Sequence, residues 1–224
     1  MTLASLHSPF APISIAIDGP AAAGKGTLAR RLAAAYELAF LDTGALYRGV
    51  AWLILEAGGD PADQATAARV ADGFDLAAIE GADIRTRKVG AAASVVAANP
   101  DVRAALLAFQ RRFATQPPAG VRGSVLDGRD IGTVVCPDAS LKLFVTASPE
   151  ARARRRWLEL VARNPALTEE QVLADIKERD ARDRSRDSAP LEQAGDAHLI
   201  DTTHLSINAA FAAAQALVDP LFAG

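Results

Sequence analysis

The sequence predicts an α/β fold with a mainly parallel central sheet flanked by helices. Along the 224 residues, segments with helical apolar periodicity alternate with short apolar runs, as in strand–helix–strand units. The runs at 121–126 and 141–145 are consistent with parallel strands buried on both faces. A glycine-rich turn at 19–24 lies between the first apolar run and the first helical segment. We therefore expect one domain, from 13 to 224, behind a flexible leader at 1–12.

The first half of the chain is predicted to begin with a strand–helix–strand–helix series. The expected elements are a strand at 13–17, a helix at 25–37, a short strand at 38–41, and a helix at 43–57 that Thr43 caps. The glycines and proline at 58–61 end this helix. Residues 62–98 are less regular, with expected helices at 62–71 and 86–98 and short extended pieces around 74–79 and 83–84. We interpret 62–98 as a small insertion over the ligand.

The second half continues the alternation. A helix is expected from near Asp101, because apolar side chains at 102, 106, 109 and 113 lie on one side at helical spacing. Further strands are predicted at 121–126, 141–145 and 197–200. Further helices are predicted at 149–161, at 169–184, and as a closing amphipathic helix from Ile207 to Val218.

Composition excludes several classes of protein. Half of the residues are hydrophobic, yet no stretch approaches the roughly 20 apolar residues that cross a bilayer. The net charge of −3 argues against a nucleic-acid partner. The first twelve residues lack the features of a secretory signal. Cys136 is the single cysteine, which excludes an internal disulfide, suits a cytoplasmic location and indicates a structural thiol.

The glycine-rich turn carries the clearest chemistry, the G-x4-G-K pattern of a phosphate-binding loop. Consecutive N–H groups and the start of the next helix face an anion in such a loop, and Lys25 adds a charge for the outer phosphates. Gly26 stands where Ser or Thr usually binds Mg²⁺, so either Thr27 or Asp127 is the candidate for that metal. The residues expected to bind the donor phosphates are Gly19, Pro20, Ala21, Ala22, Ala23, Gly24, Lys25, Gly26 and Thr27.

Two further segments qualify as a second anion site. Thr43 and Arg48 follow a predicted strand end, where open α/β sheets bind ligands, although a helix cap and a surface arginine explain them equally well. Asp127 follows a predicted strand and is placed to handle Mg²⁺, and Arg129 is suited to clamp an acceptor phosphate. A carboxylate at Asp130 suits the amino group of cytosine and would repel the O4 of uracil. A polar turn between strands is the alternative interpretation of this segment.

Arginines form the third candidate segment. Nine of the twenty arginines lie between Arg152 and Arg186, against four lysines in the whole chain. Arginine is the planar, bidentate phosphate donor, so the cluster indicates a small phosphorylated ligand under a lid at 152–166. Arg179, Asp183 and Arg186 form one stripe if their helix lasts that long. A solvated helix face explains some of the others, and we expect Arg182 and Arg184 to be solvated.

Four motifs together closely resemble bacterial cytidylate kinases: Gly-Pro-Ala-Ala-Ala-Gly-Lys-Gly-Thr, Leu-Asp-Thr-Gly-Ala-Leu-Tyr-Arg, Asp-Gly-Arg-Asp-Ile-Gly-Thr-Val-Val and Ile-Lys-Glu-Arg-Asp-Ala-Arg-Asp. The resemblance implies a P-loop NTPase-type fold with an NMP-binding insertion, and transfer of the γ-phosphate of ATP to CMP or dCMP with Mg²⁺. It places Arg152 and Arg156 near ATP, and Lys25, Asp127, Arg129 and Arg179 in catalysis. The expected acceptor-binding residues are Thr43, Arg48, Ser94, Arg103, Arg129, Asp130, Arg179, Asp183 and Arg186.

Rival functions leave more unexplained. A kinase of UMP, AMP or shikimate gives Asp130 no role, and a GTPase would need an Asn-Lys-x-Asp motif that the sequence lacks. A nucleic-acid-dependent ATPase fits poorly with the acidic balance. A phosphate acceptor that is already ionised needs no strong base, so His198 and His204 are expected to be structural. We expect a monomer.

Overall fold

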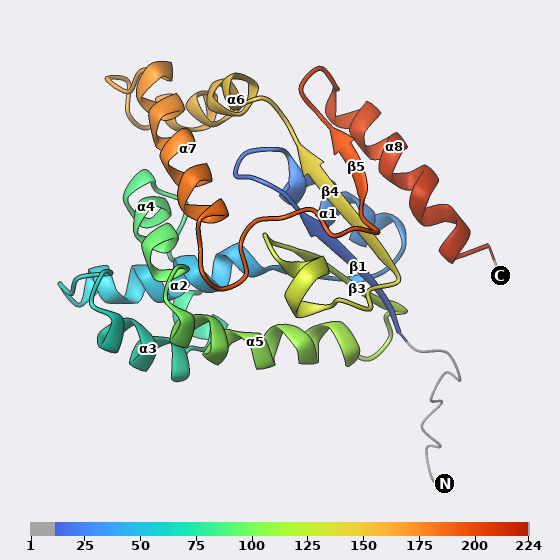
Figure 1. Cartoon of the computed structure of the whole chain (residues 1–224), viewed down its shortest axis with the longest axis horizontal. Coiled ribbons are helices and arrows are strands. Elements are labelled where there is room, and N and C mark those ends of the chain that lie inside the picture. Colours follow the sequence, from blue (N-terminus) through green and yellow to red (C-terminus); the bar gives the residue numbers. More distant parts are fainter. Residues whose placement is uncertain (1–11, 224) are drawn as a thin grey trace, which may run out of the picture.

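The computed structural model describes residues 12–223 and has a parallel sheet with helices on both faces (Figure 1). The strand order is β2-β3-β1-β4-β5, and all neighbours are parallel, which confirms the predicted fold class. The predicted leader falls, apart from residue 12, outside the described residues. The strands are β1 (Ile13–Asp18), β2 (Ala39–Asp42), β3 (Gly123–Asp127), β4 (Leu141–Thr146) and β5 (His198–Asp201).

Side chains of β1 alternate between the two faces of the sheet, as the period of two along a strand requires. Ile15 and Ile17 are buried in a cluster with α1 (Lys25–Ala35) and α8 (Ile207–Val218). Ala16 belongs to the opposite cluster, with Leu126 and α5 (Pro100–Thr115). The middle strand is therefore buried on both faces, which holds the loop after it on a rigid base.

Most of the segment between β2 and β3 is helical. It contains α2 (Thr43–Glu56), α3 (Gln64–Asp72), a 3-10 helix (Leu76–Ile79), α4 (Arg87–Val96) and α5, and α2 to α5 share a second core cluster. The extended pieces predicted at 74–79 and 83–84 were wrong. The Asp75 carboxylate accepts from the Ala77 N–H at 3.1 Å, which favours the helical turn, and Ile84 lies in a turn as well.

Two helices, α6 (Pro149–Val161) and α7 (Glu169–Arg184), form a pair at one end of the sheet, with α7 beside α4 (Figure 1). Their bounds match the predicted helices. Val172 and Ile176 of α7 pack against Ala153 of α6, and the Trp157 indole donates to the Leu167 carbonyl at 2.8 Å. Proline at the first position of α6 and a Thr168–Gln171 capping box at α7 explain why both starts could be predicted.

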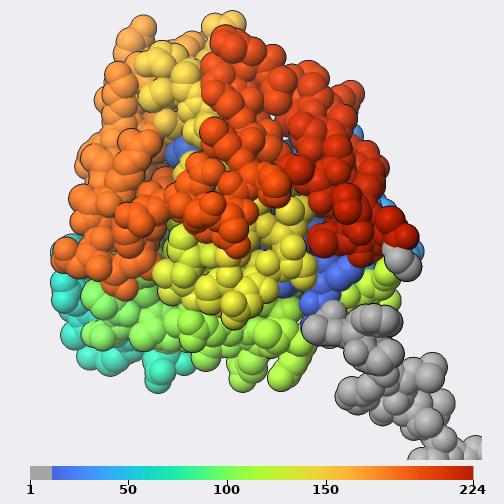
Figure 2. Space-filling model, turned by 45° about the vertical axis from the view of Figure 1, so that its right-hand side comes forward, coloured from blue at the N-terminus to red at the C-terminus, as the bar shows by residue number. Residues whose placement is uncertain are grey.

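The C-terminal segments from α7 onward (orange to red) cover much of the face seen in Figure 2. Within residues 12–223, no single helix has the length and apolar character needed to cross a bilayer. Only α4 and α5 taken together reach that length and composition, and they are bent by 97°.

Candidate active site

The carboxyl ends of the parallel strands meet at one edge of the sheet, where β1, β2 and β3 each end in an aspartate: Asp18, Asp42 and Asp127. A cavity of about 1070 Å³ opens above this edge. Its walls come from the phosphate loop, α2, α4, α6, α7 and the loop after β3. The location is the one at which open α/β sheets bind ligands.

Backbone conformation shapes the phosphate loop. Gly19 has φ +140°, and a Cβ there would lie 1.9 Å from the Val145 carbonyl oxygen, so no side chain fits. Gly24 has φ +91° and directly precedes α1. The first N–H groups of α1, which have no partners inside the helix, thus face the cavity together with the positive end of the helix dipole. This arrangement suits the outer phosphates of a nucleotide.

Lys25 is buried at the floor of the cavity. Its ammonium group donates to the Pro20 carbonyl at 2.9 Å and lies 3.8 Å from Asp127 Oδ1. Burial and the nearby Arg129 lower the pKa of Lys25 to about 7, against the opposing effect of Asp127 and Asp18. A phosphate anion in the cavity would raise this pKa again, so Lys25 is poised to bind one.

Gly26 and Asp127 are in close contact, which explains the departure from the usual loop pattern. A Cβ at position 26 would lie 3.1 Å from Asp127 Oδ2, so a side chain there would crowd the carboxylate. Burial raises the pKa of Asp127, and its Oδ1 is buried without a hydrogen-bond partner. Within the described residues no group of three His, Cys, Asp or Glu side chains could hold a metal. A single free carboxylate oxygen nevertheless fits Mg²⁺ that is bound mainly by phosphates.

The start of α2 differs from its prediction. Asp42, not Thr43, caps the helix, because its carboxylate accepts from the Ala45 N–H at 3.1 Å. The Thr43 hydroxyl instead donates to the Asp127 carbonyl at 2.7 Å and ties α2 to the end of β3. Asp42 also pairs with Arg48 at 3.3 Å and with Arg85 at 3.2 Å, so one carboxylate holds two guanidinium groups at the cavity wall.

Asp183 is fully buried and organises the opposite wall. It accepts from Arg129 Nε at 2.9 Å, pairs with Arg186, and lies 3.9 Å from Arg179 Nε. Burial alone would raise the pKa of Asp183, but Arg129, Arg179 and Arg186 together hold it below its usual range. The helix ends at Arg184, so Arg186 joins this group from just beyond α7. Burial and the neighbouring Arg129 lower the pKa of Arg179 to about 9.

Asp130 and Arg103 form a buried ion pair on the acceptor side. Arg103 also donates to the Ala97 carbonyl at 3.4 Å and lies over the Tyr47 ring, 5.7 Å from its centre. Ser94, expected to contact the base, is instead fully buried on α4 and absent from the cavity lining, and it accepts from Arg182 Nε at 3.2 Å. The expectation that Arg182 is solvated was therefore wrong, because Arg182 lines the cavity.

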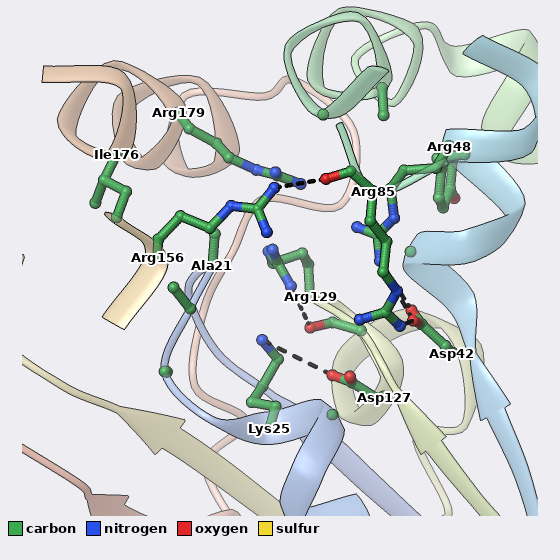
Figure 3. Close-up of a pocket in the computed structure, with 18 of the residues that line it drawn as sticks. Ala21, Lys25, Asp42, Arg48, Arg85, Asp127, Arg129, Arg156, Ile176 and Arg179 are labelled. Carbon is green, nitrogen blue, oxygen red and sulfur yellow. Dashed lines mark hydrogen bonds and ion pairs between the residues drawn. The ribbon is translucent and has the colours of Figure 1, made fainter. Parts of the chain in front are cut away.

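Guanidinium groups from separate elements converge above the phosphate loop (Figure 3). They include those of Arg48, Arg85, Arg129, Arg156 and Arg179. The buried Nε atoms of Arg48 and Arg179 have no hydrogen-bond partner among the residues described. Such a concentration of positive charge with unused donors fits a polyanionic ligand.

The sequence comparisons identify the family of this chain. Residues 15–219 match the family model "Cytidylate kinase". The cytidylate kinase of Xanthobacter autotrophicus is 58% identical over 210 residues, which cover 94% of this chain and 99% of that protein. The cytidylate kinase of Bradyrhizobium sp. is 55% identical over 210 residues, which cover 94% and 97%.

The chain belongs to the cytidylate kinase family.

This cytidylate kinase is therefore an enzyme that phosphorylates CMP and dCMP with ATP, as the motifs predicted. Among solved structures, an uncharacterized protein from Eubacterium ventriosum has a TM-score of 0.54 at 15% identity, with 92% of this chain and 98% of that chain covered. That likeness concerns the fold alone.

Arg152 lies elsewhere than expected for a residue that contacts ATP. It is 2% exposed and is absent from the cavity lining. Its guanidinium donates to Asp180 at 2.6 and 3.1 Å, and to the carbonyls of Ala147 and Ala21 at 2.9 and 3.2 Å. This arrangement corrects the expected ATP contact, because Arg152 supports the phosphate loop of the kinase from behind. Arg156 does line the cavity.

Side chains of α6, of α7 and of the loop between them bridge the kinase cleft. Arg156 donates to the Arg85 carbonyl at 2.9 Å, and Arg163 donates to Asp83 at 2.7 Å. Arg87 at the start of α4 pairs with Asp175 of α7 at 2.6 Å. The predicted lid and the predicted insertion thus contact each other directly across the opening.

Several residues of the kinase site escaped prediction. Arg85 and Arg155 line the cavity, and Asp18 bonds the loop after Asp130. Arg85 lies in the irregular stretch, where no periodicity marked it. Asp18 does carry a signal in the sequence, because it is an acid at the end of an apolar strand and directly before the glycine turn.

The residues expected to be structural do not take part in the site. His198 and His204 are exposed and absent from the cavity lining. Cys136 is half-buried, and burial raises the pKa of its thiol to about 11, so the thiol is protonated at neutral pH.

Proposed function

We propose that the cavity holds ATP and CMP or dCMP end to end, with residues 19–27 at the donor phosphates and arginines at the acceptor phosphate. The observation that supports this most directly is the convergence of cationic side chains from opposite walls on one space above Lys25. Arg48, Arg129 and Arg179 are our candidates for the acceptor phosphate. Asp183 positions Arg129, Arg179 and Arg186 rather than contacting phosphate itself, since its two oxygens face guanidinium groups.

Catalysis is then positioning and charge neutralisation. The acceptor phosphate has a second pKa of about 6, so it attacks as a dianion and no side chain has to remove a proton. Lys25 and the arginines neutralise the charge that repels the two nucleotides and the charge of the transferring group. Mg²⁺ would neutralise donor phosphate charge when bound, and Asp127 Oδ1 is the better candidate for its protein ligand. Thr27 is exposed and remains the alternative.

Selectivity for cytosine is assigned to Asp130. Its carboxylate accepts from the amino group of cytosine, whereas the O4 of uracil would face it with like charge. Arg103 holds the carboxylate in place. Arg182 lines the cavity in the adjacent part of the base subsite, and the buried Ser94 hydroxyl holds it there.

The proposal extends to the parts that move and to the setting in which the enzyme acts. The insertion at about 62–98 carries the acceptor, and the lid at about 152–166 closes over ATP with Arg156. We propose a monomeric enzyme that acts on small molecules, with no nucleic acid or membrane partner, in the cytoplasm, where these nucleotides occur.

A coupled ADP-release assay with ATP and Mg²⁺ tests the assignment of the base. We expect turnover with CMP and dCMP, and slow or no turnover with UMP, AMP and GMP. In Asp130→Ala the ratio of kcat/KM for CMP to that for UMP should fall at least about tenfold, the value of one lost hydrogen bond to a charged group.

Asp138→Ala is the matched control, because Asp138 is exposed and absent from the cavity lining. Its CMP:UMP ratio should equal that of the wild type. A wild-type enzyme that uses CMP and UMP equally well would refute the assigned base subsite. An Asp130→Ala ratio equal to the wild type, with a lowered melting temperature, would make Asp130 a structural residue.

A further inference from the structure

Asp18 occupies a position between the two halves of the site. It is the last residue of β1 and directly precedes Gly19, yet its bonds go to the acceptor side. Its two carboxylate oxygens accept from the Ile131 N–H at 2.8 Å and from the Gly132 N–H at 2.7 Å. These N–H groups belong to the two residues that follow Asp130, so the carboxylate fixes the backbone on which Asp130 stands.

The turn after Asp130 is built in an unusual way. Residues Ile131–Val135 form a π-helical turn, and such turns are rare and frequent at functional sites. An aspartate directly before a helical turn normally uses its own carboxylate to cap the free N–H groups. Asp130 does not, since no side-chain bond caps the turn from this residue. Asp18 caps it from another strand.

Because Asp18 caps the turn, the Asp130 carboxylate is not needed for that bond. Instead of folding back onto its own turn, it pairs with Arg103 and lies at the cavity wall. The space around the turn is tight: a Cβ on Gly132 would lie 3.1 Å from Lys142 Cδ and 3.4 Å from Asp18 Oδ2. The turn therefore has little freedom to shift while Asp18 holds it.

Burial disfavours the ionised form of Asp18. Its side chain is nearly inaccessible, and burial raises its pKa to about 7 although the two backbone N–H groups and Lys25 oppose this effect. An asparagine would avoid the buried charge, but its amide group would direct N–H against N–H at one of the two bonds. Only a carboxylate accepts from both.

We infer that Asp18 is a positioning residue for base selectivity, which caps the turn after Asp130 so that the Asp130 carboxylate stays available to the cytosine amino group. The inference rests on the proposed role of Asp130. It also links the donor loop, which starts at Gly19, to the acceptor base through one side chain.

The test compares Asp18→Asn with the wild type in steady-state kinetics for CMP, UMP and ATP. We expect the CMP:UMP ratio of kcat/KM to fall about tenfold, as for one lost hydrogen bond to a charged group. The KM for CMP should rise, and the KM for ATP should change less than threefold. Asp18→Ala should lower the ratio further, because Asp130 can then cap its own turn.

Val218→Ala is the matched control for lost stability. Val218 is fully buried on α8 and absent from the cavity lining, so this variant should lower the melting temperature and leave the CMP:UMP ratio unchanged. Gly132→Ala tests the same turn with Asp18 intact, and its crowded Cβ should also lower the ratio. The Gly132→Ala variant keeps the inference testable if both Asp18 variants fail to fold.

The outcomes separate the two proposals. A wild-type enzyme without preference for CMP over UMP contradicts the role of Asp130 itself. A selective wild type, with the ratio kept in Asp18→Asn and in Gly132→Ala, overturns the inference about Asp18 alone. A ratio that falls equally in Val218→Ala would show that selectivity follows stability, and would overturn it as well.

Discussion

The proposed donor and acceptor sides of this cleft differ in construction. The donor side is a single stretch, 19–27, in which two glycines with positive φ direct backbone N–H groups, and Lys25 adds a buried ammonium group. The acceptor side is made of side chains from α2, α5, α7 and the loop after β3, held by Asp42, Asp130 and Asp183. The donor side thus depends on backbone geometry, and the acceptor side depends on networks of ion pairs.

Because of this difference, we expect substitutions on the two sides to have different effects. A backbone anion site depends on local conformation, so its chemistry rests on few side chains. A charge network shares each carboxylate among several arginines, and the loss of one carboxylate leaves several buried cations uncompensated. We therefore expect donor-side variants to lose turnover while keeping the fold, and acceptor-side variants to lose stability and acceptor affinity together.

Lys25→Met should have the largest effect on turnover. We expect kcat to fall roughly 100- to 1,000-fold, the range for removal of one preorganised group that stabilises developing charge. The KM for CMP should change little, because Lys25 lies on the donor side. Initial rates at saturating ATP over a range of CMP concentrations measure both values.

Lys177→Met is the control for that change, since Lys177 is exposed on α7 and absent from the cavity lining. Its rates should match the wild type. Equal losses of kcat and CMP affinity in Lys25→Met would break the division between the two sides.

Asp183→Asn should have the next largest effect, and mainly on stability. Asp183 is fully buried among Arg129, Arg179 and Arg186, so we expect the free energy of unfolding to fall by about 3–5 kcal/mol. Urea unfolding measures this loss. The KM for CMP should rise more than the KM for ATP.

Asp187→Asn, at an exposed position just beyond α7, should leave unfolding and both KM values unchanged. An Asp183→Asn enzyme with wild-type stability would show that the arginines do not depend on their shared carboxylate.

Arg87→Ala should have the smallest effect. Its pair with Asp175 crosses the cleft at 2.6 Å, but both side chains are about half exposed, at 49% and 42%. Exposed pairs contribute about 1 kcal/mol or less, so we expect unfolding to change by no more than that and kcat/KM to change by less than about threefold. A loss of tenfold or more in kcat/KM would mean that this bridge controls closure of the cleft.

Periodicity and end signals were enough to predict most of the fold. The bounds of α6 and α7 match because Pro149 and the Thr168–Gln171 box mark where the helices start. The extended pieces near 76 and 84 were wrong because short carboxylate-capped turns have no period to detect. The cap of α2 was placed one residue late, since Asp42 and Thr43 are both good capping residues and only the tertiary bond from Thr43 to β3 decides between them.

Site residues that are contiguous in the sequence could be predicted, whereas those brought together from distant parts of the chain could not. The donor loop is contiguous, so its residues were found together. On the acceptor side, the pairing of Arg103 with Asp130 spans 27 residues and that of Arg129 with Asp183 spans 54, and no spacing rule connects them. Arg152 was misjudged for the same reason: its partner Asp180 lies on the next helix, and whether a guanidinium faces a ligand or a carboxylate depends on packing.

The order of the strands gives the molecule a modular character. Helices α2 to α5 leave the sheet at the carboxyl end of β2, at Asp42, and return to it at Gly123, the amino end of its direct parallel neighbour β3. Because the two strands are parallel, the two anchor points of this stretch lie at opposite ends of the strand pair, roughly one short strand length apart. Grafting a stretch of another length or shape between those anchors would leave the sheet and its glycine turn in place. In a scaffold of this kind, the molecule that receives the phosphoryl group can change while the nucleoside triphosphate that supplies it stays the same.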